Sequence, residues 1–236
     1  MRNVLEPAVR DCVTAVSSTF QAVFDDIEAW RVEIERRVSK VPVTSADIDE
    51  LTERLVVPAL SRDNAVIIGA GFVAAPGFLA DTEWHLAWWL GHANTFGIGS
   101  AEPSIRRLDA VEDPLSDSFR DYTTLEWWRE PAATGAAHIT GPYVDYLCTD
   151  DYTLTLTVPV LHDGHMIGVV GADLYVNEVE RLLLPRVRAI GAQATIINTS
   201  RRVVVSTDAH LPTGSILNID GLDVVPCGET SLSLVR

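Results

Sequence analysis

Asp173 is the residue best placed for chemistry, because it lies at the end of a nearly uninterrupted apolar run, Met166 to Leu174, that is rich in glycine. A carboxylate on a buried strand gives up several kcal/mol of hydration, roughly, unless a cation or strong hydrogen-bond donors replace the water. The sequence leaves two roles open for this carboxylate. Asp173 either caps a helix expected from about Asn177 or binds the cation of a ligand.

Two histidines and one glycine motif also need a chemical interpretation. His162 and His165 flank an Asp-Gly turn and could bind a metal, but no third ligand is close in sequence, which favours a solvated turn. Residues 69–74 match the G-x-G-x-x-A dinucleotide fingerprint, yet Pro76 and Gly77 stand where its helix should grow, so we expect an ordinary strand crossed by another segment. We find no G-x-S-x-G, H-E-x-x-H or P-loop motif, and therefore expect no catalytic residue, metal or cofactor.

The composition describes a globular, acidic protein. The chain has 236 residues, 47% hydrophobic and 22% charged, with a formal net charge of −15. Such a surface repels phosphate backbones and anionic membranes, so we expect neither nucleic acid nor membrane as a partner. Three distant cysteines without C-x-x-C spacing predict reduced, mostly buried thiols. No signal peptide or membrane-spanning run is recognised, and we expect a cytoplasmic protein.

A hairpin positions Asp173. Residues 151–160 alternate polar threonines with apolar residues, which predicts a strand with one buried face, and the Asp-Gly turn at 163–164 leads into the return strand.

A long helix is predicted at the N-terminus by apolar residues spaced alternately three and four apart. They are Val9, Val13, Val16, Phe20, Val23, Ile27, Trp30, Ile34 and Val38. This heptad pattern fits a helix packed along a sheet, or a helix that also contacts its twin in a homodimer.

The remaining segments give an α+β fold class. We expect a second helix at 46–60, strands at 64–74, 83–90 and 104–111, a loop-rich middle, a helix at 177–190, two strands within 194–205 and a last short strand. Helices would lie outside one mainly antiparallel, PAS-like sheet. The expected organisation is residues 1–62 for packing or dimerisation, 63–190 for the core, and 191–236 for strands that complete or extend the sheet.

The order of these motifs resembles the Cache (PDC, extracellular PAS-like) sensor domains. A long helix precedes the sheet, an aromatic pair at Trp127-Trp128 precedes Pro142-Tyr143, and the last strand closes on Gly-x-Asp at Asp173. The resemblance covers about 64–180 and implies a small-molecule sensor domain.

The resemblance also implies a ligand site. In amino-acid-binding members, the tyrosine and the terminal aspartate hold the ligand ammonium, and an arginine holds its carboxylate; Leu125 occupies that arginine position here, and Arg120 or Arg129 could replace it. We therefore expect an amine, a quaternary ammonium or an amino acid, held by charge pairing and cation–π contacts. The candidate site residues are Trp127, Trp128, Tyr143, Asp173, Glu126 and Tyr146, with Asp145 and Trp89 as weaker candidates.

Three functions remain open from the sequence. The first is a ligand-binding sensor domain that acts in signal transduction or transcriptional control. The alternatives are an enzyme on a PAS-like scaffold and a ligand-free dimerisation module. Taken without the resemblance, Trp127, Trp128 and Tyr143 also fit ordinary core or loop aromatics.

Overall fold

The computed structural model describes residues 6–39, 42–63, 65–94, 104–145, 149 and 151–236. The helices are α1 (Pro7–Val38), α2 (Ser45–Leu60), the 3-10 turn η1 (Tyr122–Thr124), α3 (Glu126–Thr134) and α4 (Val176–Arg188). The strands are β1 (Ile67–Ala74), β2 (Leu86–Leu90), β3 (Arg106–Arg107), β4 (His138–Val144), β5 (Tyr152–His162), β6 (His165–Tyr175), β7 (Thr195–Ile197), β8 (Val203–Ser206), β9 (Val224–Pro226) and β10 (Ser233–Val235). No helix in the described part is long and apolar enough to cross a membrane.

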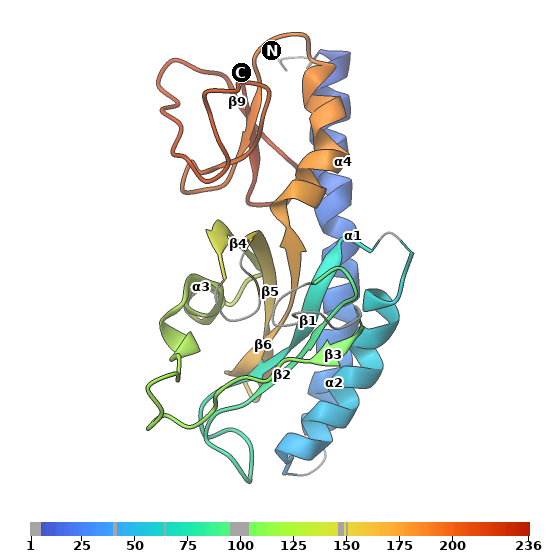
Figure 1. Ribbon diagram of the computed structural model, residues 1–236, viewed down its shortest axis with the longest axis vertical. Helices are drawn as coiled ribbons and strands as arrows, with labels where there is room; N and C mark the ends of the chain where they lie inside the picture. Colours follow the sequence, from blue (N-terminus) through green and yellow to red (C-terminus); the bar gives the residue numbers. More distant parts are fainter. Residues whose placement is uncertain (1–5, 40–41, 64, 95–103, 146–148, 150) are drawn as a thin grey trace.

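A six-stranded antiparallel sheet forms the core, in the order β3-β2-β1-β6-β5-β4 (Figure 1). Its central hairpin is the one predicted from the alternating threonines, and Asp163 and Gly164 form its turn with φ of 49° and 80°. The register pairs Thr155 with Asp173 across β5 and β6. Because paired residues on neighbouring strands share a face, the threonine row of β5 and the carboxylate of β6 lie on the same side of the sheet.

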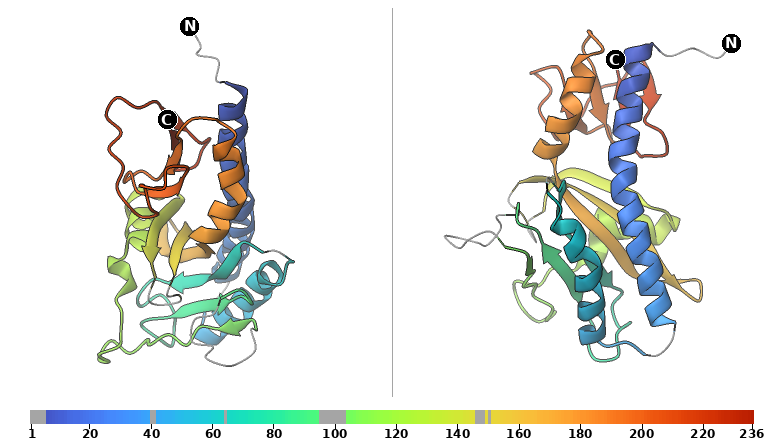
Figure 2. Two further views of the ribbon diagram at one scale, coloured as in Figure 1. Left: turned by 45° about the horizontal axis from the view of Figure 1, so that its top comes forward. Right: turned by 90° about the vertical axis from the view of Figure 1, so that its right-hand side faces the viewer.

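The helix α1 runs nearly the whole length of the molecule along the other face (Figure 2). Every predicted seam residue except the half-buried Val13 is buried within the same chain, together with Cys12. They pack mainly against β5, β6, α2 and α4. The heptad pattern is therefore explained by the protein's own core, and dimerisation through α1 stays a prediction.

The glycine motif lies inside β1. A Cβ on Gly71 would lie 2.1 Å from the Ala87 carbonyl oxygen of β2, so only glycine lets the two strands approach this closely. The chain leaves β1 for another strand and opens no helix after the glycines. The interpretation of residues 69–74 as a strand crossed by another segment is confirmed.

A capping box starts α2: the Thr44 side chain accepts from the Asp47 amide while the Asp47 side chain accepts from the Thr44 amide. The α+β, PAS-like fold class is confirmed, as are the long first helix, the second helix and the helix α4.

Three segments differ from expectation. The loop-rich middle contains α3 and β4, which carries a register shift between Thr140 and Tyr143 beside the cis peptide bond before Pro142. β3 has only two residues. The strands after residue 191 pair with one another in a second sheet, β8-β7-β10-β9, and do not complete or extend the first one.

Candidate functional site

A small cavity lies on the face of the main sheet opposite to α1. Its volume is about 20 Å³, which is room for about one water molecule. The lining residues come from strands β1, β2, β5 and β6, from the residues that follow β3 and β4, and from α3: Val73, Leu86, Trp88, Leu108, Trp127, Asp145, Thr155, Thr157, Val169 and Asp173. The sheet therefore supplies most of the lining, and Leu108, Trp127 and Asp145 come from outside the strands.

A chain of hydrogen bonds connects two acids at this cavity. Thr155 Oγ1 donates to Asp173 Oδ1 at 2.7 Å. The Tyr143 hydroxyl lies 2.8 Å from Thr155 Oγ1 and 3.1 Å from Asp145 Oδ2. Asp173 is 1% exposed and Asp145 is 8% exposed. The two carboxylates are therefore held at one site by a threonine and a tyrosine hydroxyl.

Asp173 does not cap the following helix. The N-cap of α4 is Tyr175, and no side chain makes a capping hydrogen bond there. Of the two roles that the sequence left open for Asp173, the helix cap is excluded by this geometry, and the carboxylate faces the cavity instead.

Two indole N–H groups border the same space. Trp88 Nε1 and Trp127 Nε1 are buried without a hydrogen-bond partner in the described part of the chain. Trp88 Nε1 lies 2.8 Å from the point that a Cβ on Gly69 would occupy, and Asp173 Oδ2 lies 3.5 Å from the same point. A buried donor without a partner costs about 1–3 kcal/mol, so an acceptor atom brought by water or a ligand would be stabilising here.

The predicted site residues are only partly brought together. Trp127 and Asp173 line the cavity, and Tyr143 reaches it through its hydroxyl contacts with two lining residues. Trp128 packs against Trp127 at a ring-centroid distance of 6.4 Å and also packs on Tyr122. Of these, only Trp128 contributes packing without reaching the cavity.

The other described candidates do not line this cavity, although Glu126 lines a separate, more open pocket of about 410 Å³ that Trp127 and Tyr143 also line. Glu126 Oε1 pairs with His138 Nε2 at 3.0 Å and is not among the cavity-lining residues. This hydrogen bond, with the positive charge of Arg129 nearby, holds the pKa of Glu126 below its usual range. Trp89 points to the opposite face and joins the core beneath the helices. Tyr146 lies outside the described residues.

Four residues that line the cavity were not among the main candidates: the sequence did not single out Trp88, Thr155 or Thr157, and Asp145 was a weaker candidate. A signal for the threonines was present: they alternate with apolar residues on β5, and the hairpin turn sets their register against Asp173. Trp88 had no comparable signal, because the sequence does not show that β1 pairs with β6 on one side and with β2 on the other.

The predicted turn histidines lie on the β5–β6 hairpin, where His165 is exposed and His162 is half-buried. His165 Nδ1 contacts the Asp163 carbonyl oxygen at 3.0 Å, and His162 Nε2 lies 3.6 Å from the Asp163 carboxylate. Within the described residues, no group of three or more His, Cys, Asp or Glu side chains is placed to hold a metal ion.

Comparisons with known proteins agree with this architecture. Residues 105–181 match the family model for the first PDC sensor domain of methyl-accepting chemotaxis protein-like proteins. No curated protein sequence matches the chain.

Solved structures cover nearly the whole chain. The ligand-binding domain of the Pseudomonas aeruginosa PAO1 amino acid chemoreceptor PctC, in complex with GABA, is 16% identical with a TM-score of 0.59, over 95% of this chain and 94% of that one. The Pseudomonas fluorescens chemoreceptor CtaA domain, in complex with L-valine, is 16% identical with a TM-score of 0.62, over 97% and 93%. The extracellular domain of the putative histidine kinase mmHK1S-Z3 is 13% identical with a TM-score of 0.64, over 94% and 88%. The chain thus has the PDC sensor-domain fold, and its resemblance to the Cache (PDC) sensor domains is confirmed.

Proposed function

We propose that this chain is a ligand-binding sensor domain that recognises a small amine-containing metabolite through the cavity between Asp145, Asp173, Trp88 and Trp127. The observation that carries the proposal is the pairing of two buried carboxylates with two indole rings at one cavity. Chemoreceptor domains of the same fold bind amino acids or GABA in the solved complexes, which supports a sensor role.

The chemistry of the lining favours a cation. A carboxylate pairs with an ammonium group through charge-assisted hydrogen bonds, and an aromatic face adds about 0.5–2 kcal/mol of cation–π attraction. No Arg or Lys is among the described residues that line the cavity. The proposed ligand is therefore an amine or quaternary ammonium in preference to a free amino acid.

The arginine positions considered from the sequence support this preference. Leu125, which stands where amino-acid-binding relatives of this type carry the carboxylate-binding arginine, does not line the cavity. Arg120 donates to the carbonyl oxygens of Asp117 and Phe119 on the surface, and Arg129 is exposed. An uncharged or hydroxyl-bearing tail would suit the indole N–H groups of Trp88 and Trp127.

The size of the cavity makes binding a conformational event. A space of about 20 Å³ admits about one water molecule, so a metabolite enters only when the walls separate. A ligand that binds the expanded arrangement shifts the population towards it, and this differential affinity is what a sensor needs.

Isothermal titration calorimetry against putrescine, choline, glycine betaine and L-valine tests the proposal. We expect heat from one or more amines and its loss in Asp173→Asn, because removal of one partner of a buried ion pair costs about 2–5 kcal/mol, or roughly 30-fold or more in Kd. Asp163→Asn is the matched control, because this aspartate is exposed on the hairpin turn, where asparagine also tolerates positive φ.

Three results would contradict the proposal. Unchanged amine affinity in Asp173→Asn would show that the site is wrong. A panel without any rise in melting temperature would favour a ligand-free dimerisation module. Turnover of an amine, detected by mass spectrometry, would favour an enzyme on this scaffold.

The cellular setting is also a prediction. The sequence favours the cytoplasm, whereas one structural relative is an extracellular domain. A homodimer through α1 would have to use the side of that helix that is not buried in its own core. Light scattering of the purified chain measures the oligomeric state.

A further inference from the structure

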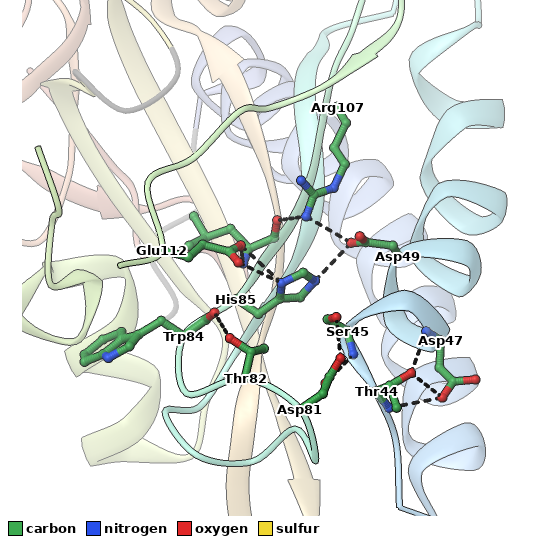
Figure 3. A network of polar contacts seen from close by, with 11 residues as sticks. Thr44, Ser45, Asp47, Asp49, Asp81, Thr82, Trp84, His85, Arg107 and Glu112 are labelled. Carbon is green, nitrogen blue, oxygen red and sulfur yellow. Dashed lines mark hydrogen bonds and ion pairs between the residues drawn. The ribbon is translucent and has the colours of Figure 1, made fainter. Parts of the chain in front are cut away.

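A buried histidine lies between two carboxylates on the helix side of β2 (Figure 3). His85 Nε2 is 3.0 Å from Asp49 Oδ1, and His85 Nδ1 is 3.1 Å from Glu112 Oε1. The side chain of His85 is 5% exposed, against 30% for Asp49 and 27% for Glu112. The imidazole is therefore shielded from water while both of its nitrogens contact acids.

This arrangement suits the protonated ring. An ionised carboxylate only accepts hydrogen bonds, and a neutral imidazole has one N–H and one lone pair, so it satisfies one acid and repels the other. An imidazolium donates to both Asp49 and Glu112. Burial alone would lower the pKa of His85, but the hydrogen bond and charge of Glu112 and the charge of Asp49 outweigh it and raise the pKa above its ordinary value of 6.5.

The cluster joins four segments that the sequence separates. Asp49 belongs to α2, His85 leads into β2, Arg107 belongs to β3, and Glu112 follows β3. Arg107 NH2 contacts Asp49 Oδ1 at 3.2 Å. It also donates to the Leu86 carbonyl oxygen, while the Leu86 amide donates to Glu112 Oε1 at 2.9 Å.

The same segments form one side of the candidate ligand cavity. The side chains of Leu86 and Leu108 line that cavity, and the Leu108 amide donates to the Trp88 carbonyl oxygen. The backbone of Leu86 is held by both Glu112 and Arg107, so any movement of this wall acts on the cluster.

We infer that His85 is a pH-responsive clamp that holds the β2–β3 wall of the cavity on α2. The part of this inference that concerns regulation of ligand binding rests on the proposed function. The part that concerns the position of the β2–β3 wall needs no ligand. Protonated His85 fixes the wall, and loss of its proton leaves Asp49 and Glu112 facing each other across a neutral ring.

Three further charged or titratable groups described near the ring are consistent with this role. Arg107 keeps the cluster neutral overall when His85 is protonated and Asp49 and Glu112 are ionised. Asp81, from the β1–β2 connection, has its pKa lowered by hydrogen bonds from Ser45 on α2 and, to a smaller extent, by His85. The buried Tyr122 hydroxyl donates to the Ala74 carbonyl oxygen at 2.6 Å, and burial raises its pKa so that it stays protonated.

The pH window follows from the directions of the shifts. Because the pKa of His85 is raised on folding, its stabilising effect is complete below its ordinary value of 6.5 and is lost as pH rises through the folded value. For Glu112, burial acts to raise the pKa, but the His85 hydrogen bond and the Leu86 amide outweigh it. The effect of Glu112 is therefore present above 4.5 and is lost as pH falls through its lowered value.

The test uses the ligand-free protein. Nitrogen NMR of the histidine rings should show His85 more than half protonated at pH 6.5, its ordinary pKa, with a proton on both ring nitrogens. Amide hydrogen exchange should report the wall, with Leu86 as the direct reporter of the Glu112 contact. Between 6.5 and the folded pKa of His85, we expect exchange at the amides of 86–90 to accelerate by up to about tenfold per unit of pH beyond the change in intrinsic rate, and above the folded pKa to follow the intrinsic rate alone.

Two variants separate the clamp from general destabilisation. Asp49→Asn keeps the shape of the site and should move the titration of His85 to lower pH, whereas His165→Gln should change nothing in β2. His85→Gln should remove the extra pH dependence of exchange at 86–90 and leave only that of the intrinsic rate. A His85 ring that is mainly neutral at pH 6.5, or exchange at 86–90 that follows only the intrinsic rate at every pH in the wild type, would overturn the inference. Failure of every amine to bind would reject the proposed function alone, because these readouts need no ligand.

Discussion

Thr155→Val is the sharpest test of the carboxylate site, because it removes one hydroxyl and keeps the shape and strand propensity of the side chain. Thr155 is 3% exposed and donates to Asp173 at 2.7 Å. Hydrogen bonds to charged groups contribute about 1.5–3 kcal/mol, roughly twice the value for neutral pairs. The Tyr143 hydroxyl also loses a neighbour at 2.8 Å. We expect the free energy of unfolding to fall by about 2–4 kcal/mol.

Thr157→Val is the matched control on the same strand and face. Thr157 is 1% exposed, and its hydroxyl donates to the neutral carbonyl oxygen of Trp127 at 2.9 Å. The expected loss is about 1–3 kcal/mol, because a buried neutral carbonyl oxygen loses its donor, and a charged acceptor such as the carboxylate of Asp173 costs more.

Urea denaturation followed by tryptophan fluorescence measures the free energy of unfolding of both variants. In thermal unfolding, a chain of this size should lose about 2–4 °C of melting temperature for each kcal/mol lost. The two variants must differ if Asp173 is ionised in the folded protein. Equal losses would mean that the Thr155 contact is an ordinary neutral hydrogen bond. The electrostatic argument for an amine ligand would then lose its basis.

Two further predictions concern packing. Gly71→Ala should destabilise the fold by about 1–3 kcal/mol or more, because the new methyl group would lie 2.1 Å from the Ala87 carbonyl oxygen. Urea denaturation measures this loss. A loss below about 0.5 kcal/mol would show that β1 and β2 shift apart easily. Cys12 and Cys227 should resist iodoacetamide in the native state and react after unfolding, because both thiols are buried and burial raises the pKa of Cys227 to about 12. Peptide mapping by mass spectrometry measures this, and fast native alkylation would contradict the described packing.

Local patterns predicted the elements that they specify. Alternating threonines and an Asp-Gly turn define β5 and β6 in type, register and face, since a strand has period two and the turn fixes the pairing. The heptad pattern defines α1, because nine apolar positions at helical spacing have no other regular structure that buries them together. These two elements place Asp173 correctly on the sheet.

Other features depend on tertiary structure and left no local signal. The helix α3 contains Pro131 and only nine residues, so its pattern is too short to separate from a loop. Glu126 is a candidate site residue from the sequence, but the structure pairs its carboxylate with His138, twelve residues away. The second sheet is built from strands of three or four residues, and the sequence does not show whether such strands extend one sheet or form another.

The segment from Leu108 to Glu112 contributes both to the cavity lining and to the histidine cluster. Ligand binding and the protonation of His85 are therefore coupled through this segment. An occupant that pushes Leu108 outward must move the segment that ends at Glu112, and it thereby weakens the contact between Glu112 and His85. Ligand binding and proton release from His85 are then the same movement, so by linkage each favours the other to an equal extent.

An occupant that displaces only Trp127, on α3, leaves the cluster intact and carries no such coupling, since α3 packs against η1, β4, β5 and β6 and not on α2. The choice between these two walls decides what the domain reports. With Leu108 as the moving wall, the response to an amine depends on pH through a residue that never touches the ligand. With Trp127 as the moving wall, the His85 cluster stays in place, and the ligand binds against a β2–β3 wall that does not move.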